Sequence, residues 1–108
     1  MPANPWHATL ELVSNAVIYN LFALIQANDP TVKHASCHAL SIQVDPGAGG
    51  AKVFIGDAAV SSTDRGAELL AGATKTYEPA GQNLYLLNQL FLKSDTSNTK
   101  VNVTFTVH

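Results

Sequence analysis

The chain has 108 residues, of which 46% are hydrophobic and only 13% are charged, and its net charge is −2. This length allows one domain with a modest core, and the low charge excludes an intrinsically disordered chain, because disordered chains are polar and self-repelling. The six basic residues are scattered and form no stripe, which argues against a nucleic-acid-binding protein. The longest apolar stretch, residues 16–25, is shorter than the roughly 20 residues of a membrane span, so we expect no membrane segment.

An extended arm is expected at the start of the chain. Residues 1–7 contain two prolines and no periodicity, so we divide the chain into an arm at 1–7 and a β-sandwich domain at 8–108. Trp6 is the only tryptophan, and we expect it to anchor the arm to its own subunit or to a neighbour. Pro5 and Trp6 are therefore candidate interface residues.

Helical spacing occurs once, after the first predicted strand. Partial alternation over residues 7–14 predicts a strand. Apolar side chains at positions 17, 18, 21, 24 and 25 then fit one face of a helix, which predicts a short helix over residues 16–27. The helix is expected to end at Asn28-Asp29-Pro30, because the residue before a proline avoids the α-helical region.

The rest of the chain reads as short strands separated by turns. The predicted strands cover residues 38–45, 51–56, 74–78, 84–93 and 101–107, and residues 68–71 form either a strand or a single helical turn. A Pro- and Gly-rich run at 46–50 predicts a hairpin between the first two of these strands, and the run at 84–93 is expected to break near Asn88. Turn signals about every 8–12 residues predict a mainly β, single-domain fold, either a β-sandwich or a jelly-roll-like barrel, with one short helix.

One cluster of residues has the chemistry of a metal site or a nucleophile: His34, Cys37 and His38. These residue types bind zinc, and His7 or His108 could supply a fourth ligand, but neighbouring side chains on a strand face opposite sides. A nucleophilic cysteine needs a stabilising pocket and an orienting partner, and the sequence contains no recognised motif of that kind. We therefore expect a buried thiol beside exposed imidazoles, no metal or other cofactor, and no enzymatic activity.

The aromatic residues indicate a core or an interface. A base-stacking surface would need basic residues interleaved with them, so we expect no nucleic-acid partner. Tyr77 and Tyr85 join Pro5 and Trp6 as candidate interface residues. A weakly charged surface loses little hydration when it is covered, which is typical of a protein that packs against neighbours.

A series of short motifs follows the predicted helix. An L-x-I-Q strand precedes a Gly-rich turn, and then come a V-F-I-G-D strand, a V-S-S-T-x-x-G loop, a Leu–Gly turn, an L-Y-L strand and a valine-rich final strand. The motifs occupy Leu40–Val44, Val53–Asp57, Val60–Gly66, Leu70–Gly72 and Leu84–Leu92. In this order they resemble small virion structural proteins of tailed bacteriophages.

The resemblance implies a non-enzymatic protein of the virion, made in the cytoplasm of the bacterial host. As a capsid cement or decoration protein, it would bind the major capsid protein, or other virion proteins, as a homo-oligomer and stabilise the phage head. Three alternatives stay open: a neck or tail component such as an adaptor, tube or spike; a host-surface or carbohydrate-binding β-sandwich; and a small metalloenzyme built on the His/Cys cluster.

Overall fold

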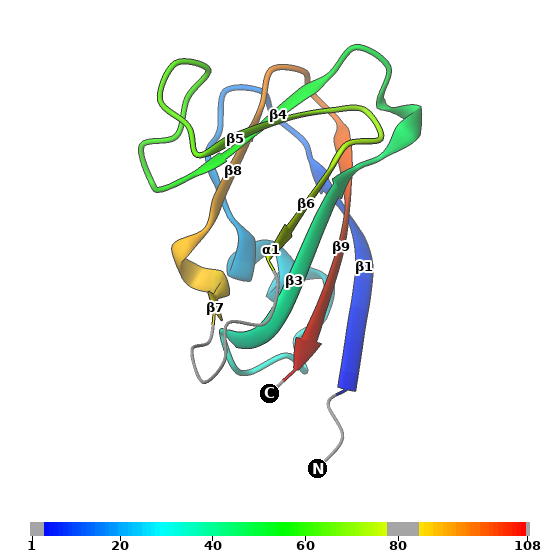
Figure 1. The fold of residues 1–108 in the computed structure, drawn as a ribbon, viewed down its shortest axis with the longest axis vertical. Coiled ribbons are helices and arrows are strands. Elements are labelled where there is room, and N and C mark those ends of the chain that lie inside the picture. Colours follow the sequence, from blue (N-terminus) through cyan, green and yellow to red (C-terminus); the bar gives the residue numbers. More distant parts are fainter. Residues whose placement is uncertain (1–3, 78–84, 108) are drawn as a thin grey trace.

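The computed structural model describes residues 4–77 and 85–107, which form two antiparallel β-sheets and one α-helix (Figure 1). The strands are β1 (Asn4–Leu12), β2 (Tyr19–Asn20), β3 (Ser36–Val44), β4 (Lys52–Gly56), β5 (Ala67–Leu70), β6 (Thr74–Tyr77), β7 (Tyr85–Leu86), β8 (Phe91–Ser94) and β9 (Thr99–Val107). The helix α1 is Leu21–Asn28, and two short 3-10 helices cover Pro46–Ala48 and Leu87–Gln89. The expected mainly β fold with one short helix is confirmed.

The strand order is that of a jelly roll. One sheet has the order β1-β9-β3-β6, with β7 also pairing with β3, and the other has the order β2-β8-β4-β5. The pairs β1–β9, β2–β8, β3–β6 and β4–β5 are antiparallel and nested in the sequence. The chain is therefore one long hairpin rolled into two facing sheets, as in double-sheet jelly rolls.

Strict alternation builds the core between the sheets. In β9, Val101, Val103 and Phe105 are buried, whereas Asn102 and Thr104 lie on the outer face. The inward residues of β3 and β4 alternate in the same way, and together these side chains form one cluster with Leu10 and Leu12 of β1. Because successive side chains of a strand point to opposite faces, the predicted final strand is confirmed in both its position and its buried parity.

The start of the chain differs from the expected arm. Residues 4–7 form the first half of β1, which pairs with β9 without interruption from Asn4 opposite Val107 to Leu12 opposite Thr99. The inward parity of Leu10 and Leu12 continues through Ala8 to the half-buried Trp6, which is why the strand starts earlier than alternation over 7–14 alone predicts. Residues 1–3 lie outside the described residues.

The expected hairpin over residues 38–56 is wrong. β3 and β4 lie in different sheets, and the chain crosses between them through the short 3-10 helix at 46–48. Asp45 caps this turn by accepting a hydrogen bond from the backbone N–H of Gly47, and Gly49 adopts a φ of 67° that favours glycine. Both strands bury their inward side chains in the same core, so placing them in facing sheets satisfies both patterns.

The helix is shorter than the expected span of 16–27. It begins at Leu21, because the side chain of Asn20 accepts a hydrogen bond from the backbone N–H of Ala23 and caps the first turn. Leu21 and Ile25 join the core, where α1 packs against β1 and the second 3-10 helix. None of the helices in the described ranges is long and apolar enough to cross a membrane.

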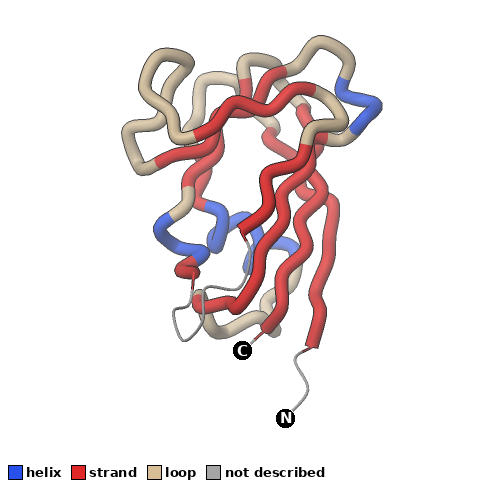
Figure 2. The backbone as a smooth tube through the Cα atoms, in the orientation of Figure 1, coloured by secondary structure: helices blue, strands red, loops and turns tan. Residues whose placement is uncertain are grey.

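The second half of the chain follows the expected sequence of short strands (Figure 2). The ambiguous segment at 68–71 belongs to a strand, β5. The run at 84–93 breaks around Asn88, where the 3-10 helix separates β7 from β8. The turn expected at 79–81 lies outside the described residues.

Candidate functional site

The fold buries the cysteine of the His/Cys cluster. Cys37 lies in β3 with no exposed surface, and its burial raises the pKa of the thiol to about 11, so the thiol is protonated at neutral pH. His34 is exposed in the loop before β3, and His38 is half-buried. The expected buried thiol is confirmed, as is the exposure of His34.

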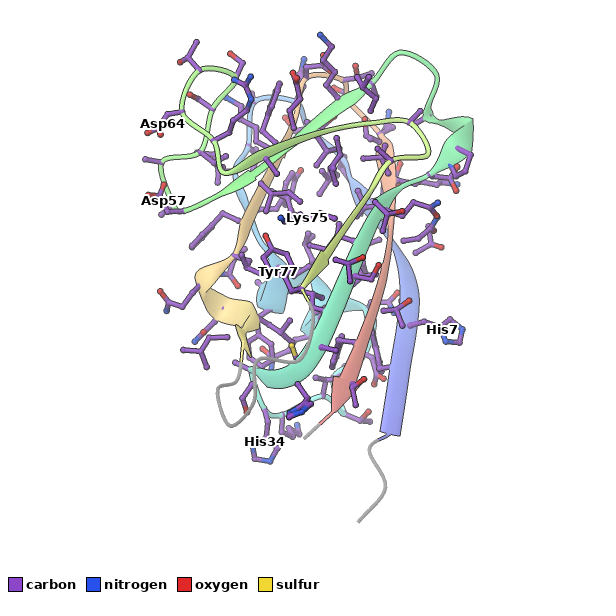
Figure 3. All side chains as sticks on the ribbon, in the orientation of Figure 1. His7, His34, Asp57, Asp64, Lys75 and Tyr77 are labelled. Carbon is purple, nitrogen blue, oxygen red and sulfur yellow. The ribbon has the colours of Figure 1, made fainter. Side chains whose placement is uncertain are left out.

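His7, one of the two possible additional ligands, lies away from His34 (Figure 3). Figure 3 places His7 beside β1, on another side of the molecule from His34, and His108 lies outside the described residues. Across residues 4–77 and 85–107, no three His, Cys, Asp or Glu side chains are close enough to hold a metal ion.

Trp6 makes specific contacts within its own subunit. Its indole N–H donates to the Asp29 carboxylate at 3.0 Å, and its ring lies on that of Phe105 with centroids 4.9 Å apart. Hydrogen bonds from the Thr31 hydroxyl and from Trp6 lower the pKa of Asp29. Trp6 therefore connects β1, β9 and the loop after α1; its expected role against a neighbouring subunit remains a prediction.

The other interface candidates lie near the margins of the same sheet. Pro5 is opposite Thr106 in the β1–β9 pair, and Tyr85 is opposite Cys37 in the β7–β3 pair. Tyr77 ends β6 and is half-buried, with the Lys75 ammonium 5.3 Å from its ring centroid (Figure 3). Their contribution to an interface is untested.

A polar outer face covers the β1-β9-β3-β6 sheet. Its side chains, defined by their alternation with the core residues, are His7, Thr9, Glu11, Ser41, Gln43, Thr74, Thr76, Lys100, Asn102, Thr104 and Thr106. Most are hydroxyls and amides, and the fully charged ones, Glu11 and Lys100, lie opposite each other near one end. We call this surface the polar face.

A hydrogen-bonded row crosses the polar face. Thr9 Oγ1 donates to Asn102 Oδ1 at 2.7 Å, and Asn102 Nδ2 donates to Gln43 Oε1 at 3.2 Å. Gln43 Nε2 then donates to the carbonyl of Gly72 at 3.4 Å. Because these groups already satisfy one another, covering the row with another protein leaves fewer polar atoms without hydrogen bonds.

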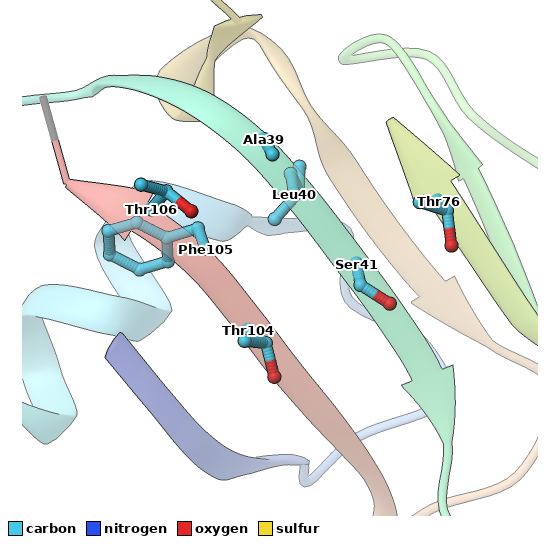
Figure 4. Close-up of a pocket in the computed structure, with 7 residues that line it drawn as sticks. All are labelled: Ala39, Leu40, Ser41, Thr76, Thr104, Phe105 and Thr106. Atoms are coloured by element: carbon cyan, nitrogen blue, oxygen red, sulfur yellow. The ribbon is translucent and has the colours of Figure 1, made fainter. Parts of the chain in front are cut away.

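A small hollow lies on the polar face beside an irregularity between β3 and β9. The register of that pair shifts between Cys37 and Leu40, and the hollow there has a volume of about 130 Å³. The residues that line it are Ala39, Leu40, Ser41, Thr76, Thr104, Phe105 and Thr106 (Figure 4). Pockets for small molecules usually have volumes of about 300–1,000 Å³, so the hollow fits part of a partner's side chain better than a substrate.

The outer face of the second sheet is partly covered by the chain itself. Phe54 points away from the main core and yet is only 4% exposed, and Val60 in the loop at 57–66 is 1% exposed. The Arg65 guanidinium lies 5.8 Å from the Phe54 ring centroid. The loop therefore covers the part of this outer face around Phe54, whereas Leu70 on the same sheet stays 54% exposed.

The loop at residues 13–18 exposes apolar side chains, which the sequence pattern did not predict. Val13, Val17 and Ile18 are 57%, 43% and 36% exposed, although the helical spacing predicted that the latter two belong to a buried helix face. The signal that could have identified the loop is Ser14-Asn15, which offers turn chemistry directly before them. Tyr19 indeed accepts, through its hydroxyl, a hydrogen bond from the backbone N–H of Ser14.

Comparison with known proteins provides one structural relative. No protein-family model matches the chain, and no curated protein sequence matches it. The chain is similar to a cryo-EM structure of the virus-like particle of the giant freshwater prawn Macrobrachium rosenbergii extra small virus, with a TM-score of 0.50 and 19% identity. The match covers 99% of this chain and 79% of that one. This likeness establishes a shared fold, in agreement with the jelly-roll strand order.

Proposed function

We propose that this chain is a non-enzymatic virion structural protein, specifically a capsid cement or decoration protein that stabilises a phage head by binding the major capsid protein. The observation that carries the proposal is the polar face: an open, weakly charged sheet surface crossed by a row of hydrogen-bonded side chains. The resemblance of the sequence motifs to phage virion proteins and the fold shared with a chain of a virus-like particle support a structural role in a virion.

A weakly charged surface with satisfied polar groups is easier to cover than a charged one. Burying an ion or an unsatisfied polar group costs free energy, so a surface rich in charges resists being covered. The row through Thr9, Asn102 and Gln43 keeps its internal hydrogen bonds when a partner covers it. Packing against a capsid therefore requires little rearrangement of this face.

A cement protein stabilises a shell by mass action. A subunit that binds the assembled shell and not the dissociated capsomers favours the assembled state. The stabilising contributions of many copies bound to one lattice add together, so a modest affinity of each copy is sufficient to stabilise the shell. The hollow beside Ser41 and Thr104 offers a place for one side chain of the capsid to insert.

The decisive experiment measures position and copy number in purified virions by quantitative mass spectrometry and cryo-EM. We expect hundreds of copies on the outer surface of the head. A dozen or fewer copies would refute the cement role and favour a neck or tail component, and absence from the particle would refute any structural role in the virion.

A pair of variants tests which surface binds. Thr104→Lys places a charge in the polar face, and we expect it to abolish or strongly reduce binding of the purified protein to heads that lack it. Ser62→Lys makes the same type of change in the exposed loop that covers the second sheet, and we expect normal binding. Equal binding by both variants would exclude the polar face.

A further inference from the structure

The edges of the two sheets, within the residues that the structure describes, are protected unequally. Native edge strands usually avoid unwanted pairing by being short, by carrying lysine or proline, or by containing a bulge. β2 has two residues, and β5 and β6 have four each, with Glu68 in the former and Lys75 in the latter. β1 has nine residues in continuous register with β9, and over residues 6–12 it contains no lysine, proline or bulge.

The outer edge of β1 is open in the described structure. None of the hydrogen bonds among described residues links the backbone of residues 6–12 to an element other than β9. The side chains of His7, Thr9 and Glu11 are exposed, and Figure 1 shows β1 at the margin of its sheet with no strand beyond it. An edge of this kind is suited to accept another strand.

We propose that β1 pairs antiparallel with β1 of a second copy of this chain, with His7 opposite Glu11 of the other copy and Thr9 on the two-fold axis. Directly opposed residues in an antiparallel pair either both direct their backbone groups toward the partner strand or both direct them away from it. Two copies of one strand therefore pair only residues of the same parity, and a two-fold axis perpendicular to the sheet keeps both polar faces on the same side.

Charge selects this register over its neighbours. With the axis at Thr9, each dimer has two identical His7–Glu11 pairs. With the axis at Ala8, Glu11 instead faces Pro5 and His7 faces Thr9, so no charges pair. With the axis at His7, two imidazoles face each other. Opposite charges across a strand pair stabilise it and like charges destabilise it, so the register centred on Thr9 is favoured.

The surrounding residues extend this complementarity. Lys100 lies opposite Glu11 in the β1–β9 pair, and the backbone N–H of Asp45 donates to the carbonyl of Lys100 at 3.0 Å, which places Asp45 beside it. Across the dimer, the row would read Asp45, Lys100, Glu11 and then His7 of the second copy. The charges alternate in sign along the row when the imidazole is protonated.

The pairing joins the two five-stranded sheets, and with them the two polar faces, into one continuous sheet. The inference deepens the proposed assembly role and rests on it for its biological meaning, because it names a second copy of the chain as a partner. The dimer itself is a property of the isolated protein. If the purified chain is monomeric but is abundant on phage heads, the dimer proposal fails and the virion role stands. If the purified chain is dimeric but is absent from virions, the virion role fails and the dimer stands.

The test measures self-association of the purified full chain by sedimentation equilibrium at pH 6.0 in low salt. Histidine side chains generally carry a proton at that pH and glutamate side chains do not. We expect a monomer–dimer equilibrium. His7→Glu and Glu11→His each make two attractive pairs repulsive and should weaken the dimer about tenfold, whereas the double variant His7→Glu/Glu11→His should restore it.

Two controls keep the result interpretable. Thr76→Glu adds the same negative charge as His7→Glu at an exposed position of β6, the opposite edge of the sheet, and should leave dimerisation unchanged. In the unsubstituted protein, alternate backbone amides of β1 should gain protection from hydrogen exchange as concentration rises. A monomer at concentrations on the order of millimolar, single variants that bind like the parent, or a double variant without rescue would overturn the proposal.

Discussion

Replacing Trp6 with alanine tests whether the chain begins with an integral strand or with a loosely attached arm. The substitution removes the ring that lies 4.9 Å from Phe105 and the indole N–H that donates to Asp29. If residues 4–7 are part of the sheet, unfolding the domain must break both contacts. Ser62→Ala, in the exposed loop before β5, is the control.

The magnitude follows from the partial burial of the ring. Removing a fully buried aromatic side chain costs about 3–5 kcal/mol, and an aromatic pair contributes about 0.5–1.5 kcal/mol beyond its buried area. Trp6 is half-buried, so we expect Trp6→Ala to lower the free energy of unfolding by about 2–3 kcal/mol. The exposed control should change it by less than about 0.5 kcal/mol.

The loss of stability caused by Trp6→Ala should also depend on pH. The hydrogen bonds from Thr31 and Trp6 lower the pKa of Asp29 in the folded protein, and this contributes stability that is present above the unfolded pKa and is lost as the pH falls through the folded pKa. Trp6→Ala removes one of those bonds. The difference between parent and variant should therefore be largest above about pH 4 and shrink in stronger acid.

Urea denaturation followed by far-UV circular dichroism provides the measurement, because the variant has no tryptophan for fluorescence. The assignment of residues 4–7 to an integral strand is refuted if Trp6→Ala unfolds at the same urea concentration as Ser62→Ala at neutral pH. The contribution of the hydrogen bond between Trp6 and Asp29 is refuted if Trp6→Ala lowers the free energy of unfolding equally at pH 7 and in strong acid.

Three further predictions concern the core and the loops. Asp95→Ala should lower the free energy of unfolding, measured by urea titration at neutral pH, by about 1 kcal/mol, because Asp95 Oδ1 accepts a hydrogen bond from the backbone N–H of Lys52 at 2.8 Å. That bond is the main reason for the lowered pKa of Asp95, so the cost should diminish below about pH 4; a pH-independent cost would contradict this. Val103→Ala should cost about 2 kcal/mol and its outward neighbour Thr104→Ala less than about 0.5 kcal/mol, and equal costs would contradict the assigned parity of β9. Cys37, with a thiol pKa of about 11, should react with a thiol reagent at pH 8 about 100-fold more slowly in the folded than in the urea-unfolded chain, and fast native labelling would contradict its burial.

The sequence pattern predicts strands better than it predicts which strands pair. Alternation located β9, and the break near Asn88 was correct, because both depend on local signals. The pairing of β3 was predicted incorrectly, since Pro46 to Gly50 is typical of a hairpin turn but serves here as a crossover between sheets. Turn composition sets where the chain bends, and only packing of both inward faces decides the direction in which it continues.

Surface features were the part of the structure least predictable from the sequence. Burial of Cys37 could be expected from its residue type, whereas the row of Thr9, Asn102 and Gln43 joins residues up to 93 positions apart in the sequence. Such a row becomes visible only when the register of three strands is known. The same holds for the open edge of β1, because no local pattern indicates which strand lies at a margin.

The nested topology links assembly to the completion of folding. β1 and β9 are the first and last strands of the described chain, and Thr9 and Asn102 meet although 93 positions separate them. Closing so long a loop is among the least local steps of folding, so the β1–β9 pair depends on the strands nested within it. The polar face, which includes β9, and the edge of β1 then exist only in the finished domain. Partly folded chains would lack both surfaces, which confines association through them to native subunits.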